Sequence, residues 1–230
     1  MVRLSLINDG GGGECMDPIG YFLNNTERIA AYAQVHFHVV LIVVAISLVL
    51  WIPVGIIITR NERLAQISLS IANLFMCIPS LALFSIFVTI PFLGLGIKSA
   101  ATALVMYAML PLLRNVYKGV KSVDKSVLEA GKGMGMSSWR IFWEIELPLA
   151  LPVIFAGIRI TVVLTTGMTT VATFIGVQSL GRLIQHGITR SNYDMILVGA
   201  IIVAVISLAL DFILGKIEKR LISPGLRVNS

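Results

Sequence analysis

Long apolar stretches alternate with short polar ones along most of this chain. Five of them stand out, at about residues 36–59, 65–90, 99–119, 149–176 and 193–214. Each holds about 20 residues or more, the length that an α-helix needs to cross the roughly 30 Å hydrocarbon core of a bilayer. A helix also satisfies its own backbone hydrogen bonds in lipid. The pattern therefore predicts an all-α membrane protein with about five transmembrane helices.

Prolines interrupt this pattern. Pro53, Pro79 and Pro111 fall within the first three stretches, and Pro148 and Pro152 open the fourth. Each proline removes a backbone donor and weakens a helix locally. Two interpretations stand side by side: ordinary membrane helices, which tolerate proline, or helices that bend around a pathway.

Composition agrees with a membrane protein and excludes other classes. Of the 230 residues, 57% are hydrophobic and 13% are charged, and the mean hydropathy is +0.90. Soluble domains carry about 25% charged residues. The length allows about five or six spanning helices with short connections, so no soluble catalytic domain fits beside them. The two cysteines and three histidines lack the spacing of a metal site. We expect no metal, no cofactor and no nucleic-acid partner, only membrane lipid around the helices.

The lysines and arginines predict the orientation of the chain. When inter-helix segments are placed on alternate sides, one side receives twelve cations and the other five, with Arg159 inside a span. Cytoplasmic segments are the ones enriched in Lys and Arg. We therefore expect the amino terminus outside and the carboxyl terminus in the cytoplasm. The cation-poor side holds Arg3, Arg28, Lys98, Arg182 and Arg190.

The two ends of the chain lie outside the apolar pattern. Gly12-Gly13-Glu14 is what a ribosome-binding sequence ahead of Met16 would encode, so initiation at Met16 is favoured over a flexible glycine-rich tail. We divide the chain into an upstream extension or disordered tail (1–15), an extracytoplasmic segment (16–34), the transmembrane domain (35–215) and a basic cytoplasmic tail (216–230).

A polar segment, EAGKGMGMSSWRIFWEIELP at Glu129–Pro148, lies between the third and fourth apolar stretches. Helical spacing over Lys125–Met134 places small and apolar side chains on one face and charged ones on the other. Ser126 followed by Glu129 fits a capping box that would start this helix. The apolar face holds Val127, Ala130, Gly131 and Met134, and the charged face holds Lys125, Glu129 and Lys132.

This short helix is weak by itself. Interior glycines cost about 1 kcal/mol each relative to alanine, and so short a helix is marginal in water. A flat face of alanine and glycine lets another surface approach closely, so docking to a protein partner is one interpretation. The other is a loose surface helix, supported by ion pairs worth about 0.2–0.5 kcal/mol each.

The same segment resembles the EAA loop of permease subunits of ATP-binding-cassette (ABC) importers. That family's pattern reads Glu-Ala-Ala, three residues, Gly, nine residues, Ile, any residue, Leu-Pro. Six of the seven fixed positions match, and Gly131 stands where alanine is usual. The matching segment consists of Glu129, Ala130, Gly131, Gly135, Ile145, Leu147 and Pro148.

The resemblance implies a function for this segment. In that family the loop is a coupling helix that sits in a groove of a cytoplasmic ATPase dimer, so the permease itself is not an enzyme. It further implies a MetI-like type I fold, a second permease subunit, for which a related heterodimer is favoured over a homodimer, an external substrate-binding protein, and the cell membrane of a bacterium. We expect Gly135 to end the helix in a left-handed cap and Pro148 to begin the next span.

The substrate is also indicated by resemblance. The stretches LPLLRNVYKGV, GKGMGM, LPLALPVIFAGIR and ISPGL are similar to the osmoprotectant branch, which imports glycine betaine, carnitine or choline. Methionine permeases share the architecture and stay an alternative. An ion-coupled carrier is a further alternative, but only Arg159 and Asp211 are deep charges, and no internal repeat is evident.

Threonines recur in the fourth apolar stretch. Thr161, Thr165, Thr169 and Thr173 follow one another at intervals of four and therefore share one slowly rotating stripe of a helix. One hypothesis is that this stripe lines the translocation pathway with weak, exchangeable hydrogen bonds. The alternative is helix packing, in which small hydroxyl residues let helices approach closely.

Overall fold

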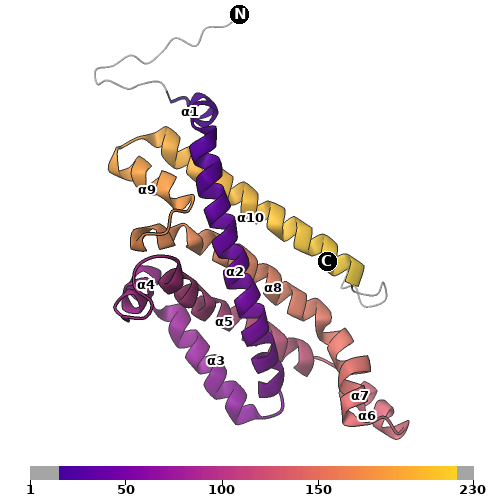
Figure 1. Cartoon of the computed structure of the whole chain (residues 1–230). Helices are drawn as coiled ribbons and strands as arrows, with labels where there is room; N and C mark the ends of the chain where they lie inside the picture. The colour runs from indigo at the N-terminus through magenta and orange to yellow at the C-terminus, as the bar shows by residue number, and fades with distance from the viewer. Residues whose placement is uncertain (1–15, 222–230) are drawn as a thin grey trace, which may run out of the picture.

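Helix follows helix along the chain in the computed structural model, which describes residues 16–221 (Figure 1). Residues 1–15, on which the predicted start at Met16 depends, lie outside the described range. So do residues 222–230 of the predicted tail, which include the ISPGL stretch. The elements are α1 (Pro18–Asn24), α2 (Thr26–Ile58), α3 (Glu62–Cys77), α4 (Ser80–Val88), α5 (Ile97–Lys121), α6 (Lys125–Gly133), α7 (Ser138–Ile141), the π-helical segment η1 (Phe142–Glu146), α8 (Leu147–Thr169), the 3₁₀ segment η2 (Val171–Ile175), α9 (Gly181–Thr189) and α10 (Tyr193–Leu221).

Four continuous helices within the described range are long and apolar enough to cross a bilayer: α2, α5, the run from α7 to α8, and α10. The first begins earlier than the apolar pattern predicts, at Thr26. Its first turns belong to the bundle, since Ile29 clusters with Leu183 of α9 and Val198 of α10. The expected extracytoplasmic segment 16–34 therefore contains α1 and the first turns of α2.

The second apolar stretch is broken instead of forming one straight span. α3 and α4 meet at an angle of 98° around Pro79. Ile78 takes the extended conformation that a following proline favours, and its carbonyl accepts a hydrogen bond from the hydroxyl of Tyr107. The bend thus has a local cause, and α5 satisfies the carbonyl that the break leaves free.

The bent pair still carries the chain from one end of α5 to the other. At the start of α3, Glu62 accepts a hydrogen bond from the Tyr117 hydroxyl near the end of α5, at 2.8 Å. At the end of α4, the Phe87 carbonyl accepts from the Ser99 hydroxyl near the start of α5, at 3.3 Å. Counted as one broken crossing, α3 and α4 bring the number of spans to the predicted five.

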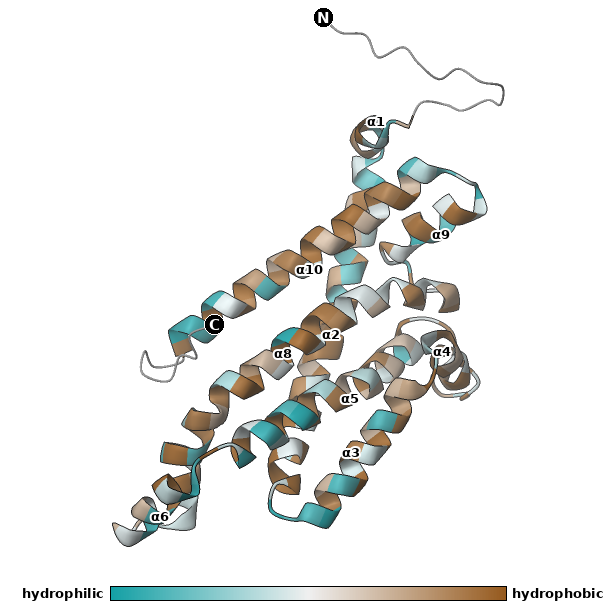
Figure 2. Ribbon diagram, turned by 180° about the vertical axis from the view of Figure 1, so that it is seen from behind, coloured by the Kyte–Doolittle hydropathy of each residue, from teal (hydrophilic) through white to brown (hydrophobic). Residues whose placement is uncertain are grey.

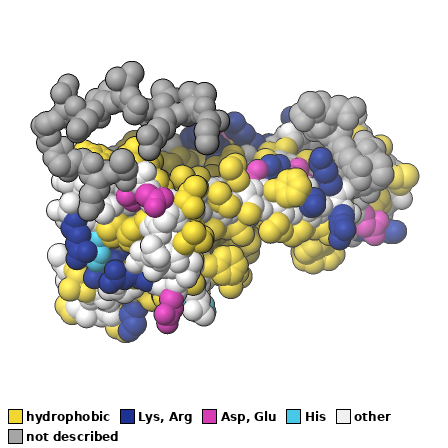
Figure 3. Space-filling view, turned by 90° about the horizontal axis from the view of Figure 1, so that it is seen from above, with side chains coloured by type: hydrophobic (Ala, Val, Ile, Leu, Met, Phe, Trp, Pro, Cys, Tyr) yellow, Lys and Arg dark blue, Asp and Glu magenta, His cyan; other side chains and the backbone are white. Residues whose placement is uncertain are grey.

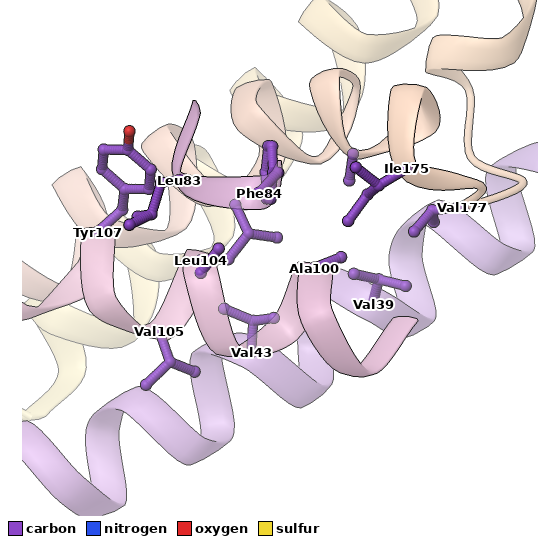
Figure 4. Close-up of a cluster of buried hydrophobic side chains, with 12 residues drawn as sticks. Val39, Val43, Leu83, Phe84, Ala100, Leu104, Val105, Tyr107, Ile175 and Val177 are labelled. Atoms are coloured by element: carbon purple, nitrogen blue, oxygen red, sulfur yellow. The ribbon is translucent and has the colours of Figure 1, made fainter. Parts of the chain in front are cut away.

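α5 is the central helix of the bundle. It packs against α2, α3, α4 and α8, and most of its apolar window is buried. Figure 4 shows side chains from α2, α4, α5 and the η2 region converging on one core, with Leu104 of α5 near Val43 of α2 and Phe84 of α4. Pro111 lies inside this helix but does not end it, and the helix continues to Lys121.

The outer surface is apolar along the lengths of the helices and charged at their ends. Figure 2 shows hydrophobic residues along α2, α8 and α10 and hydrophilic ones near the last turns of α10. Figure 3 shows hydrophobic side chains across the middle of the visible face, with Lys and Arg gathered toward both ends. This distribution is that of a protein whose middle is surrounded by lipid.

Candidate functional site

The motif-bearing helix α6 protrudes at one end of the bundle, beyond the ends of α2 and α5 (Figure 1). Asp124 caps it, because its carboxylate accepts the backbone N–H of Ser126 at 2.9 Å. This hydrogen bond lowers the pKa of the Asp124 carboxyl. The predicted capping box of Ser126 and Glu129 is wrong: the helix begins at Lys125, so Ser126 is already its second residue.

The end of α6 matches its prediction. Gly135 has φ +78°, the left-handed conformation that glycine adopts at little cost. Its N–H donates to the Lys132 carbonyl at 2.9 Å, and the Met136 N–H donates to the Gly131 carbonyl at 3.1 Å. This pair of bonds is a Schellman motif. The turn redirects the chain toward α7.

Gly131 is the point at which α6 touches the rest of the subunit. A Cβ atom there would lie 3.1 Å from Cδ1 of Ile145 and 3.4 Å from Cγ1 of Ile141. Glycine instead of the usual alanine thus allows close contact between two parts of the motif. Val127 is 41% exposed and the C-cap residue Met134 is 74% exposed. Glu129 and Ala130 are also exposed, whereas Leu128 is half-buried. The small and apolar face of the helix therefore touches its own subunit at Gly131 and is left uncovered at Val127, Ala130 and Met134.

The segment after α6 forms one helical rod from Ser138 to Thr169. Pro148 lies in the first turn of α8, as expected for the start of the span, but the helical run extends upstream through η1 and α7 to Ser138. Pro148 follows closely on η1, in which the Leu147 N–H donates to the Phe142 carbonyl. A π-turn widens the helix locally. This one immediately precedes Pro148, which has no backbone N–H to donate. Leu147 packs against the core cluster at the end of α5.

An ion pair fixes this rod to the end of α2. Glu146 is buried, and its carboxylate accepts from Nη2 of Arg60 at 2.6 Å. The Arg60 guanidinium also lies 5.5 Å from the ring centre of Phe142, which meets Trp143 edge to face. Sequence reasoning counted Arg60 only as a topology signal. The pair spans 86 positions, and no local pattern connects them.

The threonine stripe lies inside the subunit. Thr161, Thr165, Thr169 and Thr173 are each no more than 2% exposed. The hydroxyls of Thr161 and Thr169 donate to carbonyls one turn earlier, at 2.8 and 2.7 Å, and Thr173 bonds with the loop after η2. This geometry favours the packing alternative within one subunit, and a role in the pathway stays a prediction.

The two deep charges, Arg159 of α8 and Asp211 of α10, pair with each other away from the threonine stripe. Arg159 makes two hydrogen bonds of 2.8 Å to Asp211 of α10 and one of 3.2 Å to Glu218. The network borders a groove of about 590 Å³ that is otherwise mostly apolar. Paired charges cost far less in a membrane than single ones, so the network joins α8 to α10.

Comparison with known proteins assigns this architecture. Residues 51–223 match the model of a family described as "Binding-protein-dependent transport system inner membrane component". The chain belongs to this family. Curated relatives include the carnitine transport permease protein OpuCB of Listeria monocytogenes, 36% identical over 91% of this chain and 95% of the relative. The osmoprotectant import permease protein OsmW of Salmonella typhimurium is 35% identical over 92% and 100%.

Solved structures agree on the fold. The chain superimposes on the MetNI methionine ABC transporter in an inward-facing conformation with a TM-score of 0.76, at 20% identity over 86% of this chain and 98% of that one. An amino acid ABC transporter gives a TM-score of 0.68 at 15% identity, over 90% and 97%. The predicted MetI-like permease fold of a type I importer is therefore confirmed.

Proposed function

We propose that this permease couples ATP hydrolysis to import through α6, which inserts into a cytoplasmic ATPase subunit. The observation that carries this is the combination of one close contact at Gly131 with an otherwise uncovered small and apolar face. A partner that covers that face would move α6, and the rod from Ser138 to Thr169 would transmit the motion into the membrane. The hydrolysis itself belongs to the partner, and this chain has no enzymatic role.

The cations near α6 support an orientation of the chain in the membrane. Arg60, Arg63, Lys118, Lys121 and Arg140 lie near α6 at the ends of α2 and α5 and the starts of α3 and α7. An excess of Lys and Arg marks the cytoplasmic side. The amino terminus then lies outside and the carboxyl terminus inside.

The transported solute is a small osmoprotectant of the glycine betaine, carnitine or choline type. Support comes from the relatives, including the glycine betaine/carnitine/choline permease OpuCB of Bacillus subtilis, 37% identical over 84% of this chain. Quaternary ammonium groups are commonly bound by aromatic cages. Within residues 16–221, the aromatic rings in contact with one another are Trp139, Phe142 and Trp143. They lie beside α6, where no solute site is expected. Selectivity then lies mainly in the external binding protein.

The working transporter contains more than this chain. One permease offers one α6, whereas ABC ATPases act as dimers, so a second permease is required, and a related but different subunit is favoured. The stripe of Thr161, Thr165, Thr169 and Thr173 would reach the pathway only if α8 moves away from its neighbours, since it is buried in the present conformation.

The test is a paired substitution on α6. Glu129→Ala with Ala130→Glu places a charge on the face that the ATPase would bury, where an unpaired charge is costly. We expect co-purification of the ATPase and substrate-stimulated ATP hydrolysis to fall about tenfold or more in proteoliposomes. Ser138→Glu, which places a new carboxylate outside α6, serves as the control. Undiminished stimulation in the paired variant would show that α6 is not the coupling element.

A further inference from the structure

The groove between α8 and α10 is charged at one end and mostly apolar along the rest of its length. Arg159 and Asp211 form the charged end, and the groove has a volume of about 590 Å³. Both helices are long enough to cross a bilayer, and they lie side by side (Figure 2). We call this feature the α8–α10 groove. The rest of its lining consists of Ala156, Ile160, Val163, Leu164, Ser207 and Leu208.

Arg159 reaches across to α10 and joins two carboxylates there. Its Nε and Nη2 atoms each donate to Asp211 at 2.8 Å, and Nη1 donates to Glu218 at 3.2 Å. A Cβ atom on Gly215 would lie 3.5 Å from the guanidinium carbon of Arg159, so the guanidinium lies close over the backbone of α10. The side chains of Arg159, Asp211 and Glu218 are still 36%, 33% and 22% exposed. The charged end of the groove is therefore accessible to a ligand.

This triad of Arg159, Asp211 and Glu218 has hydrogen-bonding capacity and charge to offer. It combines one guanidinium with two carboxylates, so it carries one negative charge in excess. A guanidinium has five N–H donors, and three of its N–H groups are used within the triad. The carboxylates thus favour a cation, and the two remaining N–H donors of Arg159 favour an anionic oxygen. Excess charge is costly near lipid, which favours a ligand with a cationic group.

The triad lies between the headgroup level and the hydrocarbon core. Glu218 directly precedes Lys219 and Arg220 in the last turn of α10, and cations at helix ends reach the headgroup region. Asp211 lies about 10 Å deeper, at the 1.5 Å rise per residue of an α-helix. Ser207 and Leu208 continue in the same direction, away from the end of α10. The α8–α10 groove therefore runs from the headgroup level toward the middle of the bilayer.

We infer that the α8–α10 groove binds one phospholipid with a primary-amine headgroup, of the phosphatidylethanolamine type. One acyl chain occupies the apolar part of the groove. The ammonium group donates to the carboxylate of Glu218, and the phosphate accepts from the free N–H groups of Arg159. A primary ammonium has N–H donors for a carboxylate, whereas the quaternary ammonium of a choline headgroup has none. This inference does not depend on the proposed function, because it concerns the surface of the helices alone.

The dimensions of the groove favour an acyl chain over a helix of the second permease. A helix about 10 Å across that followed residues 156–164, a length of about 12 Å, would occupy about 900 Å³. The groove has about 590 Å³. A small zwitterionic solute would satisfy the charges of the triad but leave the apolar length of the groove uncovered. A phospholipid fills both parts.

The experiment counts lipids bound to the complete transporter, purified in detergent, by native mass spectrometry. Phosphatidylethanolamine, phosphatidylglycerol and phosphatidylcholine with the same acyl chains are titrated separately. We expect the wild type to bind phosphatidylethanolamine about tenfold more tightly than the other two lipids, because only its ammonium forms charge-assisted hydrogen bonds with the triad. Glu218→Gln removes the excess charge and should weaken binding of phosphatidylethanolamine about tenfold without changing that of phosphatidylglycerol.

A second pair of variants tests the groove itself. Val163→Trp places a large ring in the lining of the groove and should remove one bound phosphatidylethanolamine per copy of this chain. The matched control is Val205→Trp, at a position of α10 that is 57% exposed and outside the lining, and it should bind lipid as the wild type does. Unchanged midpoints of thermal unfolding in lipid-free detergent would show that both variants are folded. Because Glu218→Gln and Val163→Trp act on different parts of the site, either one tests the inference by itself.

Four results would overturn the inference. Equal affinity for the three lipids would mean that the triad does not recognise the headgroup, and normal binding by Val163→Trp would place the lipid elsewhere. Displacement of bound phosphatidylethanolamine by glycine betaine would assign the groove to solute. A cross-link from a cysteine at position 163 to the second permease would show that a helix covers the groove. The titration contains neither ATP nor solute, so its result stands whether or not α6 couples to an ATPase.

Discussion

Two helices of nine residues each, α6 and α9, lie at opposite ends of the molecule and are attached in different ways. α6 touches its own subunit closely through Gly131 and leaves Val127 and Met134 exposed. α9 buries Leu183 and packs closely through Gly187. Both helices are amphipathic, so the difference lies in whether the chain itself supplies the covering surface. α6 requires a partner to be fully packed, whereas α9 is a rigid platform.

The largest expected effect comes from forcing α9 away from α10. In Gly187→Leu the new Cβ would meet Cγ1 of Ile196 at 2.6 Å and the Asn192 carbonyl oxygen at 2.9 Å. Overpacking against backbone costs about 3 kcal/mol, so the midpoint of thermal unfolding in detergent should fall. The neighbouring exposed change Ile188→Leu should leave it in place. An unchanged midpoint for Gly187→Leu would mean that α9 is not rigidly packed.

The next effect concerns the anchoring of the rod below α6. Arg60→Ala leaves the carboxylate of Glu146, whose side chain is 9% exposed, without its partner. Because Arg60 itself is more than half exposed, we expect a loss of about 2 kcal/mol instead of the larger cost of a fully buried pair. The control is Arg140→Ala, which breaks the exposed pair with Glu144 and should cost much less, because exposed ion pairs contribute little to stability. Equal losses for both variants in chemical unfolding would contradict the anchoring role.

A smaller effect is expected where α6 turns back toward α7. Gly135→Leu must hold a side chain at φ +78°, which costs about 1–2 kcal/mol. The strain should fray the end of α6 and lower substrate-stimulated ATPase activity in the reconstituted transporter. Gly135→Asn should lie between the variant and the wild type, because asparagine tolerates this conformation better. Full activity of the leucine variant would show that coupling does not depend on the left-handed turn at Gly135.

The smallest effect should come from stabilising α6 without touching its surroundings. A Cβ on Gly133 would have no neighbour within 4 Å, so Gly133→Ala should gain at most about 1 kcal/mol from helix propensity. Hydrogen exchange of the α6 amides should slow by up to about fivefold. Exchange that is already slow in the wild type would show that α6 is not the loosely held helix that its few contacts indicate.

Much of this protein follows from signals between residues close together in the chain. Apolar stretches of membrane length, the glycine at the end of α6 and the spacing from Glu129 to Pro148 are all local features. They were sufficient for the helical class, the number of crossings and the left-handed turn at Gly135. The N-cap of α6 was missed by two residues, because Asp124 and Ser126 are both good caps and only the structure shows that Asp124 accepts the capping hydrogen bond.

Other features depend on which helices become neighbours, and one sequence does not contain that information in any short pattern. In the sequence, Glu146 is one charged residue among several, and only the folded chain brings Arg60 to it. The spacing of the threonines likewise does not say which way their stripe faces, and only the structure shows that Thr165 and Thr169 face the interior. In the same way, the arginines of α9 count as scattered cations along the chain. Only the packing of the helices brings Arg182 and Arg190 close to Arg28 of α2, where all three lie near His186, because tertiary contacts decide which segments become neighbours.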